Sequence, residues 1–399
     1  MKYRRFGKTE IQMPVLTLGC MRFQQAWQDK DWDEIEEANQ ANLEATLAHA
    51  LELGINHIET ARGYGTSEMQ IGRFLKKLDR DSYILQSKVA PAKDNHEFQT
   101  NVEKTFSYLG VEVIDLFTIH GVNNRECAQW AMQKGGALDQ AVKLQKEGRI
   151  KHIGFTSHAP PPLILELIET NAFSFVNLHY YYINQATEIC VQAAQKRDMG
   201  LLVISPNDKG GHLWKNPTEM AELTAPLHPM QFNSLFCLQH AGVHTLTMGA
   251  AQPSDLDLHE KALDYYDQRD ELIPPMVENL DHQIAMRFGA DWLTNYQKNI
   301  PYYYDTPGEV NVWEILRILT YGKGLGLESF AKARYNMLGK SGHWFPGQNA
   351  QSFDEEAILK VCADNPYGYE IPMRLREANR LFGDEEIAKK AGPQSSHSS

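Results

Sequence analysis

Cysteine is scarce in this 399-residue chain, and its placement excludes a disulfide-stapled domain. The five cysteines are odd in number, widely separated and never form a CxxC pair: Cys20, Cys127, Cys190, Cys237 and Cys362. A disulfide framework or a zinc site needs closely spaced cysteines. We therefore expect reduced thiols, no intact cysteine metal site and a cytoplasmic location.

Positive charge and long apolar runs are also lacking. Acidic residues outnumber basic ones by 51 to 39, which gives a formal net charge of −12. Such a charge disfavours nucleic acid and anionic membranes as main partners. No segment reaches the roughly 20 apolar residues that cross a bilayer. The basic residues 1–8 are not followed by the apolar run of a secretory signal.

A GxGxxG turn after the first strand is missing as well, which disfavours the open, doubly wound sheet. What the chain does contain is a regular alternation of short apolar strands and amphipathic helical patterns. Eight segments are predicted as strands: residues 15–21, 55–60, 83–88, 113–120, 150–158, 175–180, 201–205 and 245–248. Eight such repeats in one domain favour an α/β fold closed into a (β/α)8 TIM barrel.

The pattern changes at Pro274-Pro275. We expect a barrel at residues 1–270, a mainly helical extension at 271–390 and a disordered tail at 391–399. The extension contains one repeated spacing, in which Pro307, Val312 and Leu316 are matched by Pro366, Ile371 and Leu375. Two unrelated helices that both begin with an early proline would give the same match.

Four polar residues lie at the ends of three consecutive predicted strands or on the loop after one of them: Glu59, Tyr64, Lys88 and His120. Singly, each has an ordinary structural interpretation, such as a hydrogen-bonded core histidine or a solvated lysine. Adjacent barrel strands bring their ends to one mouth, so we expect these side chains to meet.

The set suits proton transfer to a carbonyl oxygen. A phenol has a pKa of about 10, which is high for proton donation and return near neutral pH. We expect the Lys88 ammonium to lower the pKa of Tyr64 and the Glu59 carboxylate to keep that lysine charged. His120 could orient and polarise the carbonyl. No side chain supplies hydride, so a nicotinamide cofactor is expected.

Five motifs resemble the aldo-keto reductase family in order and spacing over residues 1–270. They are GINHIETARGYGTSE at 54–68, QSK at 86–88, IDLFTIH at 114–120, GRIKHIGFTS at 148–157 and SP at 205–206. The resemblance implies a barrel that reduces aldehydes or ketones with NADPH. It makes Tyr64 the proton donor, Lys88 its activator and His120 the carbonyl orienter. Glu59 replaces the family's aspartate and is one methylene longer.

The resemblance also implies the cofactor-binding residues. The nicotinamide carboxamide positions are Ser157, His158 and Asn177, of which His158 can donate a hydrogen bond, while Ile204 lacks the usual stacking ring. The phosphate positions are Ser205, Asn207, Lys209, Gly210 and Gly249. Residues 248–260 contain no lysine or arginine to grip a 2′-phosphate, so NADPH is expected with NADH as the alternative.

The extension resembles the 4Fe-4S ferredoxin-like domain that some relatives carry. Thr306-Pro307 and Asn365-Pro366 stand at the positions of its Cys-Pro pairs, and Cys362 alone could still be a ligand. No iron–sulfur cluster is therefore expected. We predict that aromatic packing fills its space, from Tyr302, Tyr303, Tyr304 and Trp313. The domain would cover the barrel mouth or only stabilise the protein.

Three functions compete. The first is NAD(P)H-dependent reduction of a small carbonyl substrate. The second is a regulatory protein or pseudoenzyme that binds nicotinamide cofactor on the same barrel. The third is an electron-transfer enzyme with clusters in the extension. Neither a particular carbonyl substrate nor an oligomeric state can be read from the sequence.

Overall fold

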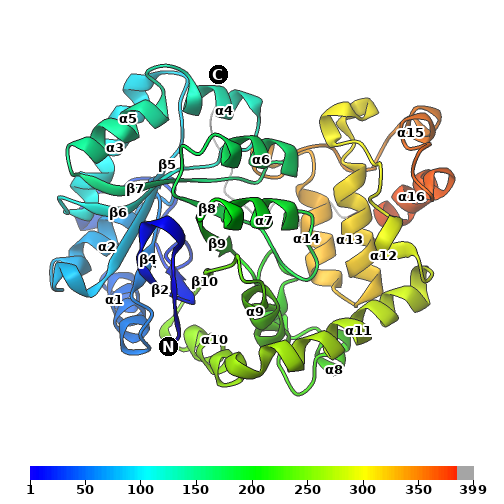
Figure 1. Cartoon of the computed structure of the whole chain (residues 1–399), viewed down its shortest axis with the longest axis horizontal. Helices are drawn as coiled ribbons and strands as arrows, with labels where there is room; N and C mark the ends of the chain where they lie inside the picture. Colours follow the sequence, from blue (N-terminus) through cyan, green and yellow to red (C-terminus); the bar gives the residue numbers. More distant parts are fainter. Residues whose placement is uncertain (384–399) are drawn as a thin grey trace. The chain divides into compact units, whose positions relative to one another are not determined.

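The computed structural model describes residues 1–383, and a closed barrel of eight parallel strands organises it (Figure 1). Around the barrel the strand order is β10-β3-β4-β5-β6-β7-β8-β9. The strands are β3 (Leu16–Gly19), β4 (His57–Glu59), β5 (Ile84–Val89), β6 (Ile114–Ile119), β7 (Ile150–Thr156), β8 (Phe175–Leu178), β9 (Gly200–Ile204) and β10 (Thr245–Gly249). The predicted barrel is confirmed, with all eight predicted strands present.

An amino-terminal hairpin of β1 (Tyr3–Arg5) and β2 (Gln12–Pro14) precedes the first barrel strand. It brings Phe6 and Met13 into a fully buried cluster with Leu116, Phe175 and Leu202. Packing there is tight, because a Cβ on Gly154 would lie 2.4 Å from the Phe175 ring. Apolar burial of this kind supplies most of the free energy that holds the strands together.

Helices connect the strands, as expected for βαβ units, and one more, α10, follows the last strand. They are α1 (Glu37–Glu52), α2 (Ser67–Leu75), α3 (Asn95–Leu109), α4 (Arg125–Met132), α5 (Ala137–Lys146), α6 (Pro161–Glu169), α7 (Glu188–Lys196), α9 (Pro229–Gln239) and α10 (Asp257–Glu260). The two ends of α3 have the capping residues that helices commonly use. The Asp94 side chain accepts a hydrogen bond from the His96 amide, and Gly110 ends the helix at a φ of 65°.

The chain forms two compact units, and each draws on two stretches of sequence. The first contains Met1–Pro206 and Asn233–Asp267. The second contains Asn207–Phe232 and the chain from Gln268 onward. The expected division at residue 270 remains a prediction, and the tail expected at 391–399 lies outside the described residues.

The second unit consists of helices and loops. Its helices are α8 (Thr218–Leu223), α11 (Arg269–Phe288), α12 (Trp292–Asn295), α13 (Val312–Gly324), α14 (Glu328–Met337), α15 (Glu355–Val361) and α16 (Ile371–Phe382). The pattern break expected at Pro274-Pro275 is wrong in detail, because both prolines lie inside α11. They are the sixth and seventh residues of α11, beyond its first turn, so each removes one helical hydrogen bond without ending the helix.

Trp292 forms the aromatic centre of this unit and is 1% exposed. It stacks on Phe288 at 5.0 Å and on Tyr296 at 5.7 Å between ring centroids, and its indole N–H donates to Thr320. The predicted filling by Tyr302, Tyr303, Tyr304 and Trp313 is wrong, because these side chains are partly or largely exposed. Three consecutive tyrosines have no periodic pattern, so their sequence does not indicate which of their side chains would be buried.

The two residues before the repeated prolines hydrogen-bond to backbone carbonyls. Asn365 Nδ2 donates to the carbonyls of Asn295 and Lys298, at 2.9 and 2.6 Å. The Thr306 hydroxyl lies 2.6 Å from the carbonyl of Val310. Within residues 1–383, no cluster of three or more His, Cys, Asp or Glu side chains could hold a metal ion. In the same range, no helix has both the length and the apolar character to cross a membrane.

Candidate active site

Three neighbouring strands deliver the four predicted catalytic side chains. Glu59 ends β4 and Lys88 lies near the end of β5. His120 directly follows β6, and its amide donates to the Val89 carbonyl on β5 at 2.8 Å. Because β4, β5 and β6 are adjacent and parallel, their carboxyl ends meet at one side of the barrel. The structure therefore brings the four residues together as expected.

Glu59 and Lys88 form a buried ion pair, with side chains 3% and 2% exposed. The Lys88 ammonium donates to Glu59 Oε1 and to the Thr60 carbonyl, the latter at 2.7 Å. Burial alone would lower the pKa of Lys88, but the charge of Glu59 and the nearby Tyr64 raise it above its ordinary value. The lysine thus stays charged, and the extra methylene of Glu59 does not prevent pairing.

Tyr64 lies between Lys88 and His120. The Lys88 Nζ is 4.6 Å from the centroid of the tyrosine ring, and the His120 ring meets that ring edge-on at 5.8 Å. Burial raises the pKa of Tyr64 above its usual value, and the charge of Lys88 acts in the opposite direction. The expected net lowering of this pKa is therefore wrong, because desolvation of the phenolate outweighs the ammonium. Tyr64 is a protonated phenol at neutral pH.

The loop that carries Tyr64 is held by residues that the sequence did not single out. A Cβ on Gly65 would lie 2.0 Å from the Ala26 carbonyl, so only glycine fits there, at a φ of 57°. The Trp27 ring meets Tyr64 edge-on at 6.5 Å. Proximity of residues 26–27 to Tyr64 depends on the long loop after β3, whose Ala26 carbonyl accepts from the Thr66 amide at 3.0 Å, and no spacing rule predicts that contact.

A second buried ion pair supports the same loop. Arg62 Nη1 donates to Glu68 Oε2 at 2.7 Å, and Ser87 donates to the other oxygen of Glu68 at 2.6 Å. Asp29 also bonds to Arg62 and accepts from Lys104 on α3. Arg62 and Glu68 are six residues apart in the sequence, and charged residues at this spacing are usually exposed. The sequence therefore did not predict this ion pair.

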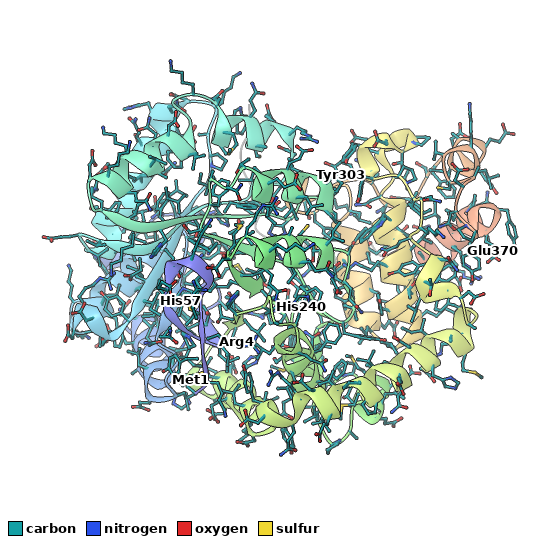
Figure 2. The ribbon with its side chains drawn as sticks, viewed as in Figure 1. Met1, Arg4, His57, His240, Tyr303 and Glu370 are labelled. Carbon is teal, nitrogen blue, oxygen red and sulfur yellow. The ribbon has the colours of Figure 1, made fainter. Side chains whose placement is uncertain are left out.

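His57 lies two residues before Glu59 in β4 and is a core residue (Figure 2). Its Nδ1 lies 2.7 Å from the Thr17 hydroxyl, and burial lowers its pKa to about 3. The ring is therefore neutral and is not available as a general acid at ordinary pH.

The predicted carboxamide-binding residues lie at the ends of β7 and β8. The Ser157 hydroxyl donates to the Val122 carbonyl at 2.7 Å and accepts from the Ala159 amide. Asn177 is fully buried, and among the described residues its Nδ2 has no hydrogen-bond partner. The His158 amide donates to Asn123 Oδ1 at 2.8 Å. An orphaned buried amide donor is costly unless a ligand meets it.

The predicted phosphate-binding residues divide between the two units. Ser205, at a φ of 51°, and Gly249 belong to the first unit, whereas Asn207, Lys209 and Gly210 belong to the second. Burial, together with the nearby Arg334, lowers the pKa of Lys209 to about 7. The structure therefore does not show these residues as one assembled site.

Arg22 is a cation that the sequence analysis did not consider. A Cβ on Gly249 would lie 3.0 Å from Arg22 Cδ, so the arginine stem crosses the backbone of this glycine. Arg22 follows β3 and Gly249 ends β10, two strands that pair in parallel. The composition of residues 248–260 gives no sign of Arg22, because this cation comes from the end of a different strand.

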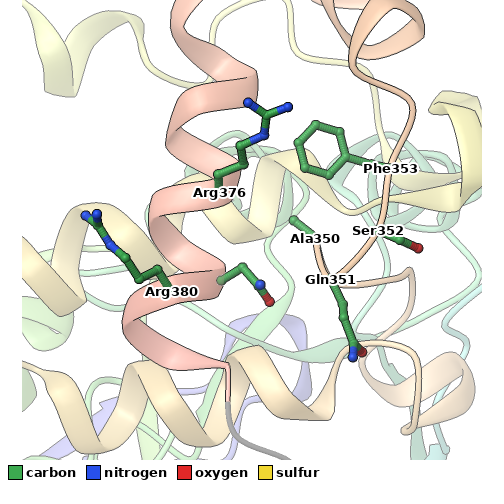
Figure 3. A pocket seen from close by; sticks show the side chains of 7 residues that line it. Ala350, Gln351, Ser352, Phe353, Arg376 and Arg380 are labelled. Atoms are coloured by element: carbon green, nitrogen blue, oxygen red, sulfur yellow. The ribbon is translucent and has the colours of Figure 1, made fainter.

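A separate pocket of about 300 Å³ lies in the second unit, beside α16 (Figure 3). Its lining is Ala350, Gln351, Ser352, Phe353, Arg376, Asn379 and Arg380. Arg376 is paired with Glu355. None of the predicted site residues lines this pocket, so it is not the catalytic centre.

Comparison with known proteins agrees with the barrel. The sequence model of the Aldo/keto reductase family matches residues 15–278. An L-glyceraldehyde 3-phosphate reductase of Escherichia coli is 24% identical over 177 residues, which are 40% of this chain and 46% of that protein. An aldo-keto reductase of a Mycobacterium species is 28% identical over 147 residues, 34% of this chain and 48% of that protein. The chain thus spans about half the length of these curated relatives.

Solved structures show the same fold. An aldo-keto reductase of Bacillus halodurans, solved in its holo form, superposes with a TM-score of 0.56 at 19% identity. The superposition covers 68% of this chain and 96% of that structure. At this level of identity the likeness concerns the fold of the barrel.

Proposed function

Because the chain belongs to the aldo/keto reductase family, a family of oxidoreductases, we propose that it reduces an aldehyde or ketone to an alcohol with Tyr64 as proton donor. The observation that carries this proposal is the buried Glu59–Lys88 pair, whose ammonium lies 4.6 Å from the Tyr64 ring centroid. A permanently charged lysine against a phenol is suited to hold the phenolate formed after proton transfer.

The chain's own residues would act in a fixed order. His120 would donate a hydrogen bond to the substrate carbonyl oxygen and orient it beside Tyr64. Tyr64 would release its proton to that oxygen as charge develops there. Lys88, held by Glu59 and the Thr60 carbonyl, would stabilise the phenolate until it regains a proton. A bound nicotinamide cofactor supplies the hydride that reaches the carbonyl carbon.

The residues present fit such a cofactor. The orphaned Nδ2 of buried Asn177 is a donor that could meet a carboxamide oxygen, with Ser157 and His158 on the adjacent strand end. Ser205, Asn207, Lys209, Gly210 and Gly249 are the proposed phosphate-binding residues. A barrel that lacks an aromatic ring at Ile204 would hold the nicotinamide through hydrogen bonds more than through stacking.

We expect NADPH to bind more tightly than NADH, and Arg22 to contribute to the difference. Its guanidinium follows a stem that crosses Gly249, next to a segment without lysine or arginine. Arg22→Gln should raise the Kd for NADPH by about 10-fold, the value of one charged hydrogen bond, and leave that for NADH within about 2-fold. Titration by nucleotide fluorescence measures both, with Arg73→Gln on α2 as the matched control. Equal losses for both nucleotides would contradict this role.

The proposal as a whole is tested by cofactor titration followed by a panel of aldehydes and ketones. Consumption of NADPH or NADH that depends on the carbonyl supports the reductase. Nucleotide binding without consumption by any member of a broad panel would instead favour a cofactor-binding regulatory protein. All five cysteines are buried and outside any disulfide, which supports a cytoplasmic setting for either activity.

A further inference from the structure

The pocket beside α16 contains none of the residues used in the reaction proposed above (Figure 3). One side of it is α16, which carries Arg376, Asn379 and Arg380, and the other is the segment 350–353 before α15. All of these residues belong to the second unit. The lining contains two guanidinium groups and no carboxylate, so its charge is positive. A cavity of about 300 Å³ is large enough for a small organic molecule.

The two arginines lie on one face of α16. They are four residues apart, a spacing that puts side chains one above the other on a helix. Like charges at this spacing repel each other, and an anion that binds between them offsets the repulsion. Arg376 is paired with Glu355 on α15. Arg380 has no hydrogen bond or ion pair with any residue of the described range 1–383, so its N–H groups are open to a ligand.

Asn379 brings a third donor to the lining, because its side-chain amide has a fixed orientation. The Ala350 amide donates to the Tyr335 hydroxyl oxygen at 3.1 Å, and that hydroxyl donates to Asn379 Oδ1 at 2.9 Å. Since Oδ1 accepts this proton, the other end of the amide, Nδ2, is a donor. Within the described part of the chain, no residue accepts a hydrogen bond from Nδ2. Tyr335 is fully buried, so the group that orients the amide is itself held in place.

We propose that this pocket binds a small phosphomonoester, with Arg376, Arg380 and Asn379 as donors to the phosphate and Phe353 in contact with the organic part. A phosphomonoester carries about 1.5 to 2 negative charges at neutral pH. Its oxygens point in different directions, so they can accept from several donors of the pocket at once. A carboxylate has a single charge, and its two oxygens lie in one plane. The donor-rich lining therefore favours phosphate.

Arg376 can bind a ligand while it remains paired. A guanidinium has several N–H donors, and the pair with Glu355 uses the Nη2 nitrogen. Glu355 competes with any bound anion for this cation, although it does not line the pocket. Replacement of Glu355 by glutamine should therefore strengthen phosphate binding, whereas loss of Arg380 should weaken it. Opposite effects from two changes near the same pocket are a stricter test than a loss alone.

Isothermal titration calorimetry of the full chain measures the binding. Phenyl phosphate is the probe, because it joins a phosphate to one flat ring, and it should bind more tightly than inorganic phosphate or benzoate. Arg380→Gln should raise its Kd by about 10-fold, the value of one charged hydrogen bond. Glu355→Gln should lower its Kd by about 3-fold, in keeping with the small energy of an exposed ion pair. Phe353→Leu should raise the Kd of phenyl phosphate by about 3-fold and leave that of inorganic phosphate unchanged.

Lys360→Gln is the matched control, because Lys360 is an exposed cation on α15 that does not line the pocket. It should keep the wild-type Kd, and a loss equal to that of Arg380→Gln would mean that net charge alone attracts the probe. A Kd that neither Arg380→Gln nor Glu355→Gln changes would place the probe elsewhere in the protein. Either result overturns the proposal, as does the absence of binding to the wild type.

Benzoate that binds as tightly as phenyl phosphate would overturn phosphate as the ligand class. The gain expected for Glu355→Gln keeps the test valid even if Arg380→Gln fails to fold, which circular dichroism reports. None of these measurements depends on carbonyl reduction. The proposed function and this binding site therefore stand or fall separately.

Discussion

Replacement of Tyr64 by phenylalanine should lower kcat for carbonyl reduction by about 100- to 10,000-fold, the usual contribution of a general acid. Only the hydroxyl is removed, so the ring contacts with His120 and the packing of Trp27 remain. The Kd for the nucleotide should therefore stay within about 2-fold of the wild-type value. Steady-state NADPH consumption and nucleotide fluorescence titration measure the two quantities on the same protein.

The pH profile gives an independent check on the same residue. The pKa of Tyr64 is raised above its usual value, so the reductive rate should stay level through neutral pH and fall only in the alkaline range, where the phenol ionises. Oxidation of an alcohol needs the phenolate and should rise over that range. Tyr83→Phe, which alters a buried tyrosine on another part of the barrel, should leave both profiles unchanged. Reduction by Tyr64→Phe at the wild-type rate would remove Tyr64 as the proton donor.

Removal of one partner from the Glu59–Lys88 pair should strongly destabilise the barrel. Glu59→Leu leaves an ammonium that is 2% exposed without its carboxylate. Loss of one member of a buried pair typically costs about 3–5 kcal/mol in the free energy of unfolding. Urea unfolding followed by circular dichroism measures this cost. The carbonyl of Thr60 still accepts from Lys88, but it carries no full charge to balance the ammonium.

A double variant separates stability from catalysis. Glu59→Leu combined with Lys88→Met replaces the ion pair by two apolar side chains of similar size, and such exchanges are often neutral or stabilising. The double variant should regain most of the lost stability and remain inactive, because no ammonium is left beside Tyr64. Glu59→Asp keeps the charge and is the conservative control for activity. If the double variant is as unstable as Glu59→Leu alone, desolvation of the lysine is not the cause of the loss.

Much of the barrel could be predicted because its signals are local. Apolar runs such as 113–120 and 150–158 alternate with amphipathic helical stretches, and this alternation alone indicates parallel strands joined by helices. Glu59, Lys88 and His120 could be placed together for the same reason, since consecutive parallel strands end side by side. In the extension, the signal was weaker. The repeated spacing marked two helix starts, but not the central position of Trp292.

The sequence by itself determined which elements form, in what order, and which polar side chains reach one end of the barrel, because these depend on spacing along the chain. Only the tertiary structure decided the properties that depend on distance through space. Burial reversed the expected shift in the pKa of Tyr64, since the cost of desolvating a charge depends on everything packed around it. The contact of Arg22 with Gly249 likewise joins two strand ends that lie far apart in the sequence.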